Sequence, residues 1–437
     1  MDLFGAFGMT SKKGPLNDLH IAAAAGSLEG VTRHLSRGLI DIDQVDPDGA
    51  TPLILAAERG HTRVVKYLID QLAYPYEANH QGCTALHLAC VNGHVMPVKL
   101  LLGVRLDLDL EVATNDGFTC LHLSALGGHT EVMKVLIEAG ENKDSRLPDG
   151  RTPLHVAAME GHVGAVRVLL RARANPLLTT RTTPVDTYVP LDTAVRHGRL
   201  EVVRELIGQL GLGGCAGASG GTEALRVAAQ NNHVEIIYTL VEAGVEDTGT
   251  ALLGAIAYGR EAPVKVLLQL KERSGRSTKP YVNTNAVTGE QRMGTPLLLA
   301  IGFFRHQPLP RIVRMLIDAG ADAALAVATR AHEPTGTPLE FVTRFIREKK
   351  MDGEEPTEEQ LLKLEAIRRL LLTVESVHAT SWLWRRDDPH LAHRAAKGKR
   401  KTSTPSTQLT MMLPVLRRRA RKGGLAPETV FRFSRKL

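Results

Sequence analysis

The stretch GRTPLHVAAMEGHVGAVRVLL, residues 150–170, decides the fold of this chain. Thr152 can accept a hydrogen bond from the free N–H groups at the start of a helix, and Pro153 suits the first helical turn, where no N–H is needed. Gly161 suits the left-handed residue that ends a helix. Val166, Leu169 and Leu170 are three and four positions apart, which places them on one face of a second helix. The stretch therefore predicts two short helices joined by a glycine turn.

The same pattern recurs along the chain. It begins again at Gly49 (GATPLILAAERGHTRVVKYLI), Gly82 (GCTALHLACVNGHVMPVKLLL) and Gly117 (GFTCLHLSALGGHTEVMKVLI), so the leading threonines are 33, 35 and 33 residues apart. Weaker copies begin near residues 17, 189, 223, 250 and 295, and a degraded copy runs from 337 to about 372. The sequence thus contains about nine units and a degraded tenth.

This period, together with the T-P-L-H-x-A core, resembles the ankyrin family. The resemblance covers roughly residues 17–325 and is strongest between 49 and 172. It implies an all-α ankyrin-repeat solenoid of helix-turn-helix units with β-turn or hairpin connections. The segments DPDG (46–49), NDG (115–117) and PDG (148–150) suit such tight connections.

Two steps between repeats depart from the period, and such an array can bend, or split into two stacks near residues 208–221 or 273–293. The step from Leu225 to Leu252 is 27 residues, which leaves room only for a shortened turn. The step from Leu252 to Leu297 is 45 residues and includes a polar insert at 273–293. We expect an N-terminal arm (1–16), regular repeats (17–207), a Gly-rich linker or insert (208–221), divergent repeats with the polar insert (222–325), a degraded repeat or helical cap (326–372) and a basic, largely disordered tail (373–437).

Composition favours short helices in a reducing compartment. Apolar residues make up 43% of the chain but aromatic residues only 4%, which suits closely packed helices better than a β-sandwich. The four cysteines include no C-x-x-C, and three of them fall inside repeats, so a disulfide framework is not expected. The N-terminus is a poor signal peptide, and no run approaches the roughly 20 apolar residues that span a bilayer. We expect a cytoplasmic or nuclear protein without a membrane span.

No catalytic, metal or cofactor site is predicted. The recurring histidines fall at equivalent positions of successive repeats, about 10 Å apart, so they form ladders that bond backbone groups and do not converge on one metal ion. The glycine-rich stretch 211–221 lacks the Lys-Ser/Thr ending of a phosphate-binding loop and follows a helix. No G-x-S-x-G occurs, and Cys90 and Cys120 occupy positions typical of buried residues. We therefore expect no enzyme, no cofactor and no small-molecule substrate.

The binding site is expected on the extended concave face that solenoids present. The ankyrin resemblance builds that face from the tips of the turns and the exposed ends of the first helices. The candidates at the tips are Asp48, Ala50, Gln81, Asp116, Phe118, Asp149 and Arg151. The candidates at the helix ends are Glu58, Arg59, Val91, Asn92, Leu126, Met159, Glu160, Arg196 and His197. We call these residues the predicted binding face. Phe118, Leu126 and Met159 are expected to be solvent-facing apolar anchors, although scattered exposed apolar residues are also ordinary.

The charge is concentrated at the C-terminus. Residues 373–437 carry 15 Lys and Arg against 4 Asp and Glu, whereas the rest of the chain is mildly acidic. The basic residues cluster in two groups: Lys397, Lys399, Arg400 and Lys401, then Arg417, Arg418, Arg419, Arg421 and Lys422. Three interpretations stay open: a ligand for a nuclear import receptor, a contact to nucleic acid or another polyanion, and a solvated tail.

These observations favour a scaffold or adaptor that binds a protein partner of unknown identity on the concave face, with the tail setting location or adding an electrostatic contact. One alternative is a substrate-recruiting subunit of a ubiquitin ligase, although no segment clearly matches the helical box of such subunits. Another is nucleic-acid binding through the tail, which salt dependence would reveal.

Overall fold

The structure is a computed structural model. It describes residues 18–36, 41–104, 111–180, 187–215, 221–247, 249–273, 281–283, 286–288, 291–301, 308–323, 337–348 and 357–386. The chain divides into two units, Met1–Leu371 and Leu372–Leu437, and the boundary lies close to the predicted start of the basic tail. The repeats described below all belong to the first unit.

Within these residues the predicted helix pairs are present, nine in number. The first helices are α2 (Asp18–Ala24), α4 (Pro52–Glu58), α6 (Ala85–Val91), α8 (Cys120–Leu126), α10 (Pro153–Glu160), α12 (Pro190–Arg196), α14 (Thr222–Gln230), α16 (Thr250–Ala257) and α19 (Pro296–Ile301). The second helices are α3 (Leu28–Ser36), α5 (Thr62–Asp70), α7 (Val95–Leu102), α9 (Thr130–Ala139), α11 (Val163–Arg171), α13 (Leu200–Cys215), α15 (Val234–Glu242), α17 (Glu261–Arg273) and α20 (Pro310–Asp318).

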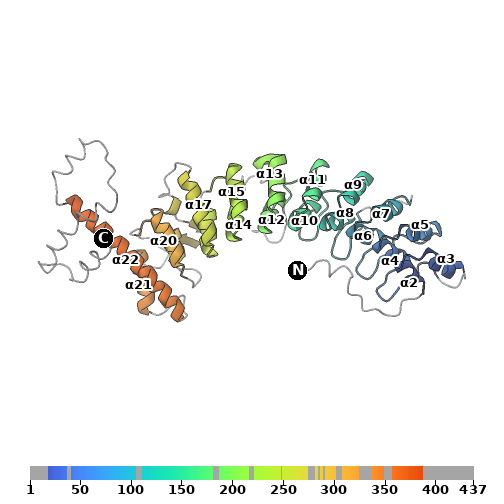
Figure 1. Ribbon diagram of the computed structural model, residues 1–437, viewed down its shortest axis with the longest axis horizontal. Helices are drawn as coiled ribbons and strands as arrows, with labels where there is room; N and C mark the ends of the chain where they lie inside the picture. The colour runs from blue at the N-terminus through green and yellow to red at the C-terminus, as the bar shows by residue number, and fades with distance from the viewer. Residues whose placement is uncertain are drawn as a thin grey trace. The chain divides into compact units, whose positions relative to one another are not determined.

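The pairs are stacked in chain order, as Figure 1 shows from α2 to α15. Each first helix packs on the first helix of the next repeat, and each second helix packs on the next second helix. Contacts between α12 and α14, and between α16 and α19, continue the row past both places where a split was possible. The stack is therefore continuous across 208–221 and 273–293.

The ends of the first helices follow the predicted capping. Thr51 accepts from the backbone N–H of Ile54 at 3.3 Å, and Thr84, Thr119 and Thr152 are N-caps in extended conformation. Gly60, Gly93, Gly128 and Gly161 all have positive φ, between 69° and 88°, where other residues are strained.

The core lies between the helix layers. The predicted positions Val64, Val65, Leu68, Val132, Met133, Leu136, Val166 and Leu169 are each 0% exposed. The small Ala56 and Ala57 are also 0% exposed, which lets neighbouring first helices approach closely. Each repeat thus covers the apolar side of the next, and no helix pair has a complete core of its own.

The connections differ from repeat to repeat. The short 27-residue step holds no hairpin: a turn follows α15, and Asp247 Oδ1 accepts from the N–H of Gly249 and Ala251, which fixes the start of α16. The polar insert contains a small antiparallel hairpin, β1 (Ala286–Thr288) with β2 (Gln291–Gly294). Helix α13 runs into the glycine-rich stretch as far as Cys215, with a non-helical residue at Gly211.

Two further helices follow the ninth pair. Helix α21 (Pro338–Glu348) packs on α19 at the place of the degraded repeat. Helix α22 (Glu358–Arg386) extends past residue 372, the predicted end of the helical cap. The N-terminal arm 1–16 and both basic clusters of the tail lie outside the described residues.

Candidate functional site

The tips of the hairpins are fixed by side chains that imitate backbone turns. Asp46 Oδ1 accepts from the N–H groups of Asp48 and Ala50, at 2.9 and 2.7 Å. Asn79 Oδ1 does the same for Gln81 and Cys83, at 3.0 and 2.9 Å. Such turns hold the chain reversal without a partner from outside.

Neighbouring tips are also bonded to each other. The N–H of His80 donates to the carbonyl of Asp48, and the N–H of Asn115 donates to the carbonyl of Gln81, both at 3.0 Å. Successive tips are therefore held at a fixed spacing before any partner arrives.

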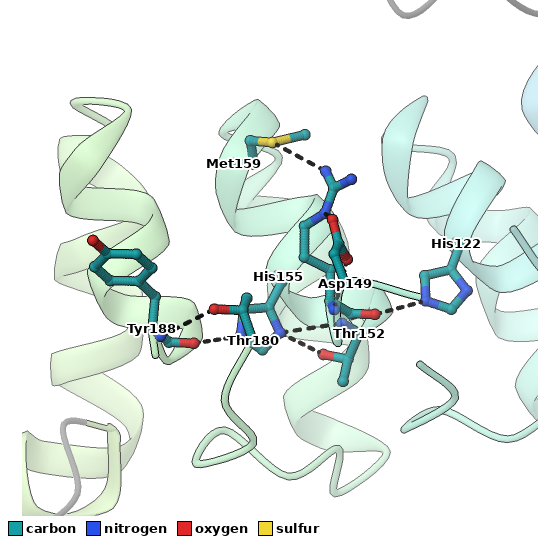
Figure 2. A network of polar contacts seen from close by, with 8 residues as sticks. His122, Asp149, Thr152, His155, Met159, Thr180 and Tyr188 are labelled. Atoms are coloured by element: carbon teal, nitrogen blue, oxygen red, sulfur yellow. Dashed lines mark hydrogen bonds and ion pairs between the residues drawn. The ribbon is translucent and has the colours of Figure 1, made fainter. Parts of the chain in front are cut away.

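The histidines of the T-P-L-H motif form a ladder toward the next repeat. His20, His122 and His155 reach the carbonyls of Ala50, Arg151 and Tyr188 with their Nε2 atoms, at 3.1, 3.3 and 3.0 Å. Figure 2 shows part of this ladder, in which His122, Thr152, His155 and Tyr188 are linked from one repeat to the next. His87 differs in its partner: its Nε2 contacts the carbonyl of Val112, at 3.0 Å, and not that of Phe118, the residue just before the next helix cap.

The hydrogen bonds fix the tautomer of these imidazoles. The backbone N–H of Thr152 donates to Nδ1 of His155 at 3.2 Å, so Nδ1 is an acceptor and Nε2 carries the hydrogen that is donated to Tyr188. Desolvation lowers the pKa of His155 to about 4, and nearby arginines act in the same direction. Desolvation likewise lowers the pKa of His122 to about 4. Both side chains are neutral structural links at neutral pH.

The Gly-His histidines form a second ladder toward the preceding repeat. Their Nε2 atoms contact carbonyls at the ends of the first helices, at 2.9–3.4 Å: His61 to Ala24, His94 to Glu58, His129 to Val91, His162 to Leu126 and His233 to Arg196. A glycine precedes His61, His94, His129 and His162, whereas Asn232 precedes His233. The glycine makes room for the ring of the next repeat: a Cβ on Gly60 would lie 2.5 Å from His94. The prediction that the histidines bond backbone groups of adjacent repeats is confirmed.

Arginine replaces histidine at two positions of this second ladder. Arg199 Nε donates to the carbonyl of Met159, and Arg260 Nε donates to the carbonyl of Gln230, both at 2.9 Å. The sequence analysis did not single out either residue, although each stands at the histidine position after a glycine. The backbone contact is kept, and an exposed, permanently charged group is added.

The predicted binding face is partly exposed and partly buried. Its exposed members are Asp48, Arg59, Gln81, Asp116, Arg196 and His197. Its half-buried members are Glu58, Asn92, Asp149, Arg151, Met159 and Glu160. The prediction that Phe118 and Leu126 are solvent-facing anchors is wrong, because they are 6% and 1% exposed. Ala50 and Val91 are likewise buried, at 4% and 7% exposed.

The burial of these residues depends on local packing, which their position in the repeat motif does not reveal. Gly127 takes the place that Arg59, Asn92 and Glu160 hold in other repeats, and a Cβ there would lie 2.3 Å from Nε2 of His129 and 3.0 Å from the carbonyl of Val91. The His129 ring and the end of α6 therefore lie close against this end of α8. The Phe118 ring packs edge-on against His122, at 6.2 Å between centroids.

Side chains on the predicted binding face contact one another at two separate places. Arg151 pairs with Asp149 at 2.6 Å and approaches the sulfur of Met159 at 3.7 Å. Figure 2 shows Asp149 at the base of this contact and Met159 at its far end. The guanidinium of Arg196 lies 5.0 Å from the centroid of the Tyr188 ring, a cation–π distance. Tyr188 was not predicted, since it follows a stretch without a clear repeat turn.

Two buried carboxyl groups replace residues that other repeats keep small or imidazole. Glu141 Oε1 accepts from the N–H of Leu121 at 2.7 Å, and Asp192 Oδ2 accepts from the N–H of Val189 at 3.2 Å. Desolvation raises the pKa of each to about 7. Both groups accept hydrogen bonds at the starts of helices.

The cysteines are buried, as their positions in the repeats predicted. Cys83, Cys90 and Cys120 are at most 2% exposed. Burial raises the pKa of the Cys83 thiol to about 11 and contributes to raising that of Cys120, with a hydrogen bond to Cys90 as the largest cause. The thiols of Cys83 and Cys120 are therefore protonated and poorly nucleophilic at neutral pH.

The described part of the chain contains neither a candidate metal site nor a candidate membrane-spanning helix. No group of three or more His, Cys, Asp and Glu side chains is placed to hold a metal ion. No described helix combines the length and the apolar content that crossing a membrane requires.

The chain is similar to known repeat proteins. Residues 19–112, 98–180, 121–213 and 191–279 match a family model described as ankyrin repeats (3 copies). It is 37% identical over 98 residues to the transient receptor potential cation channel subfamily A member 1 of Homo sapiens, a match that covers 22% of this chain and 8% of that protein.

Two further relatives are enzymes by name. The palmitoyltransferase AKR1 of Candida glabrata is 36% identical over 97 residues, 21% of this chain and 13% of that protein. The probable E3 ubiquitin-protein ligase XBOS33 of Oryza sativa subsp. japonica is 38% identical over 104 residues, 23% of this chain and 20% of that protein. The chain thus matches no more than 20% of the length of any of these relatives.

Proposed function

Because the chain belongs to the ankyrin-repeat proteins, we propose that it is a non-catalytic scaffold or adaptor that holds a protein partner on the concave face of its stack. The observation that carries the proposal is the fixed row of hairpin tips, bonded from Asp48 to His80 and from Gln81 to Asn115. Repeat proteins use such extended faces for binding. A partner that docks on a pre-organised surface loses less affinity to the cost of ordering it.

The side chains available to a partner are mostly polar. Asp48, Asp116 and His197 are exposed, and Met159 is a half-buried apolar group next to Arg151. The ladders beneath them hold the helix ends in place, so the spacing of these groups is set by the repeat. The proposed contact is therefore a broad polar surface with few apolar anchors, not a deep pocket.

Partner capture by the intact chain tests the proposal. The variant Arg59→Ala/Asp116→Ala/Met159→Ala alters the face, and Lys66→Ala/Lys134→Ala/Arg204→Ala alters exposed positions of the second helices as a matched control. The proposal predicts loss of capture in the first variant and retention in the second. Equal capture by both variants, with both folded, would contradict it.

The basic clusters of the tail have a separate proposed role, nuclear import or contact with a polyanion. Their support is the charge of residues 373–437 alone. Replacing Lys397, Lys399, Arg400 and Lys401 by Gln, in a full chain fused to a fluorescent protein, is expected to remove nuclear accumulation. Unchanged nuclear accumulation would exclude this cluster as the signal.

The ubiquitin-ligase alternative has one observation in its favour, the likeness to the rice protein named as a probable ligase, which covers 20% of that protein. A recruiting subunit would co-purify with a cullin scaffold. Absence of a cullin from the purified complex would reject this role and leave the scaffold proposal untouched.

A further inference from the structure

We infer that the face over α12, α14 and α16 binds an acidic segment of a protein partner, held by the guanidinium groups of Arg196, Arg199 and Arg260. The inference rests on the proposed scaffold function and adds the chemistry of the partner to it. All three belong to exposed residues of the continuous stack: Arg196 and Arg199 to the repeat of α12 and α13, and Arg260 to the repeat of α16 and α17, with one repeat between them.

Arginine stands in place of histidine at two positions of the second ladder. The histidines of the second ladder fill the gap between repeats with a ring, whereas Arg199 and Arg260 make the same backbone contact through Nε alone. A guanidinium has five N–H donors in a planar fork, so its terminal nitrogens stay available. Such a fork matches the two oxygens of a carboxylate.

The acids near these arginines are mostly committed to other cations. Glu201 pairs with Arg204 at 2.9 Å, Glu223 pairs with Arg226, and Glu261 pairs with Arg311 at 3.4 Å. Within the described residues, Arg196, Arg199 and Arg260 have no carboxylate partner. Glu160 and Glu235 have no ion pair there either and offset part of the positive charge.

Aromatic side chains accompany the cations. Arg196 lies over the ring of Tyr188, an arrangement that orients the guanidinium plane and leaves its edge for an acceptor. Tyr258, 46% exposed, ends α16. Gly254 lets α16 pack on the side chains of α14, since a Cβ there would lie 3.3 Å from Arg226 Cγ. Tyr258 therefore stands at the end of α16, two residues before Arg260 in the chain.

The rest of the face has the opposite character. Over the N-terminal repeats its exposed charges include Asp48 and Asp116, while Arg59 lies next to Glu58, and Arg151 is paired with Asp149. The face therefore changes from acidic to basic along the row. A polyanion such as nucleic acid presents continuous charge that the acidic part would repel, whereas a protein segment can limit its acids to the basic part.

Binding of a fluorescein-labelled, glutamate-rich peptide to the full chain tests the inference. The variant Arg196→Gln/Arg199→His/Arg260→His removes the three charges and keeps the ladder contact, because histidine makes it in the other repeats. Exposed ion pairs are individually weak, so we expect about tenfold weaker binding for the triple variant and about threefold for Arg196→Gln alone. Binding by the original chain should also weaken with added salt.

The control is Arg63→Gln, an exposed arginine of the second helix α5 that lies outside the predicted binding face, and its affinity for the peptide should be unchanged. Equal affinity of the original chain and both arginine variants would place peptide binding in the basic tail and overturn the inference. Duplex DNA that binds with the same dependence on the three arginines would overturn it in favour of a general polyanion site. Either result leaves the scaffold proposal standing, because that proposal fails only if partner capture ignores the whole face.

Discussion

His155 in α10 donates its Nε2 hydrogen to the carbonyl oxygen of Tyr188, 3.0 Å away at the start of the next repeat. Its Nδ1 atom accepts from the backbone N–H of Thr152 at 3.2 Å. One buried side chain therefore caps its own helix and ties that helix to its neighbour. Because water does not reach these hydrogen bonds, removing the imidazole would carry the free-energy cost of leaving backbone groups with fewer partners.

Replacement of this imidazole should destabilise the stack. We expect His155→Ala to lower the free energy of unfolding by about 2 kcal/mol, because the buried N–H of Thr152 loses its acceptor and the carbonyl of Tyr188 keeps only the N–H of Thr180. Urea unfolding measures the change. His197→Ala is the control: its imidazole is exposed and contacts only Thr193 of its own helix, so the expected change is within about 0.5 kcal/mol. Equal losses in the two variants would show that the ladder does not carry stability.

The buried imidazoles of His122 and His155 and the buried carboxyls of Glu141 and Asp192 predict opposite responses to pH. The folded pKa of these two histidines, about 4, lies below the ordinary value of 6.5, so their contribution to stability is complete above pH 6.5 and is lost as pH falls toward 4. The two carboxyls have folded pKa values near 7, above the ordinary values of such groups, so they favour the folded state at low pH and lose that contribution as pH rises toward 7. Between about pH 4 and 6.5 the two contributions to the free energy of unfolding change in opposite directions and offset each other.

Replacing the two carboxyls by amides of the same shape separates the pH response of the carboxyls from that of the histidines. Glu141→Gln/Asp192→Asn keeps an oxygen acceptor for each helix start and removes the charge, so this variant should be more stable than the original chain at pH about 8, where both carboxyls would be ionised. Its stability should also rise with pH between about 4 and 6.5, where only the histidine trend remains. Urea unfolding across this range measures both effects. A stability profile identical to that of the original chain would contradict the assignment of these groups.

The glycines before the ladder histidines should resist substitution for two separable reasons. In Gly93→Ala the new methyl would lie 2.5 Å from His129 and would also occupy a residue with φ of 74°. Gly140→Ala has the same kind of strain, with φ of 99°, but nothing lies within 4 Å of the methyl. We expect a loss of about 1 kcal/mol for Gly140→Ala and at least twice that for Gly93→Ala, measured by thermal unfolding. Equal losses would mean that the ring moves aside freely.

Leu126 and Met159 occupy equivalent positions but should behave differently. Leu126 is 1% exposed, so Leu126→Ala should leave a cavity and cost about 2–5 kcal/mol. Met159 is only half-buried, so Met159→Ala should cost less than about 1 kcal/mol and is suited to binding tests. Chemical denaturation of the two variants compares them. A large loss for Met159→Ala would assign it to the core and remove it from the binding face.

The repeat pattern predicts most of the fold because each position of the motif has a physical task. The threonine starts a helix, the glycine ends it with positive φ, and the histidine bonds the neighbouring repeat, so all three are readable from one unit. The continuous packing past 208–221 and 273–293 was not readable, because it depends on whether α12 meets α14 and α16 meets α19 despite unequal connections.

The candidate site was predicted less well. Exposure at a helix end depends on packing in the neighbouring repeats, which motif position does not give: Leu126 is 1% exposed, whereas Met159 at the equivalent position is half-buried. Tyr188, Arg199 and Arg260 were missed because they stand where the motif is weak or where histidine is usual. Comparison of each ladder position with its repeat neighbours would have identified the two arginines.

The central claim is that a protein partner lies along the hairpin tips and the ends of the first helices. Hydrogen exchange of the full chain, with and without its captured partner, tests this claim most directly. The account predicts slower exchange in the partner-bound state at 46–50, 79–83, 114–118 and 149–151, and unchanged exchange at the exposed turns of α5, α9 and α11. Protection confined to the second helices, or to the residues after 372, would contradict it.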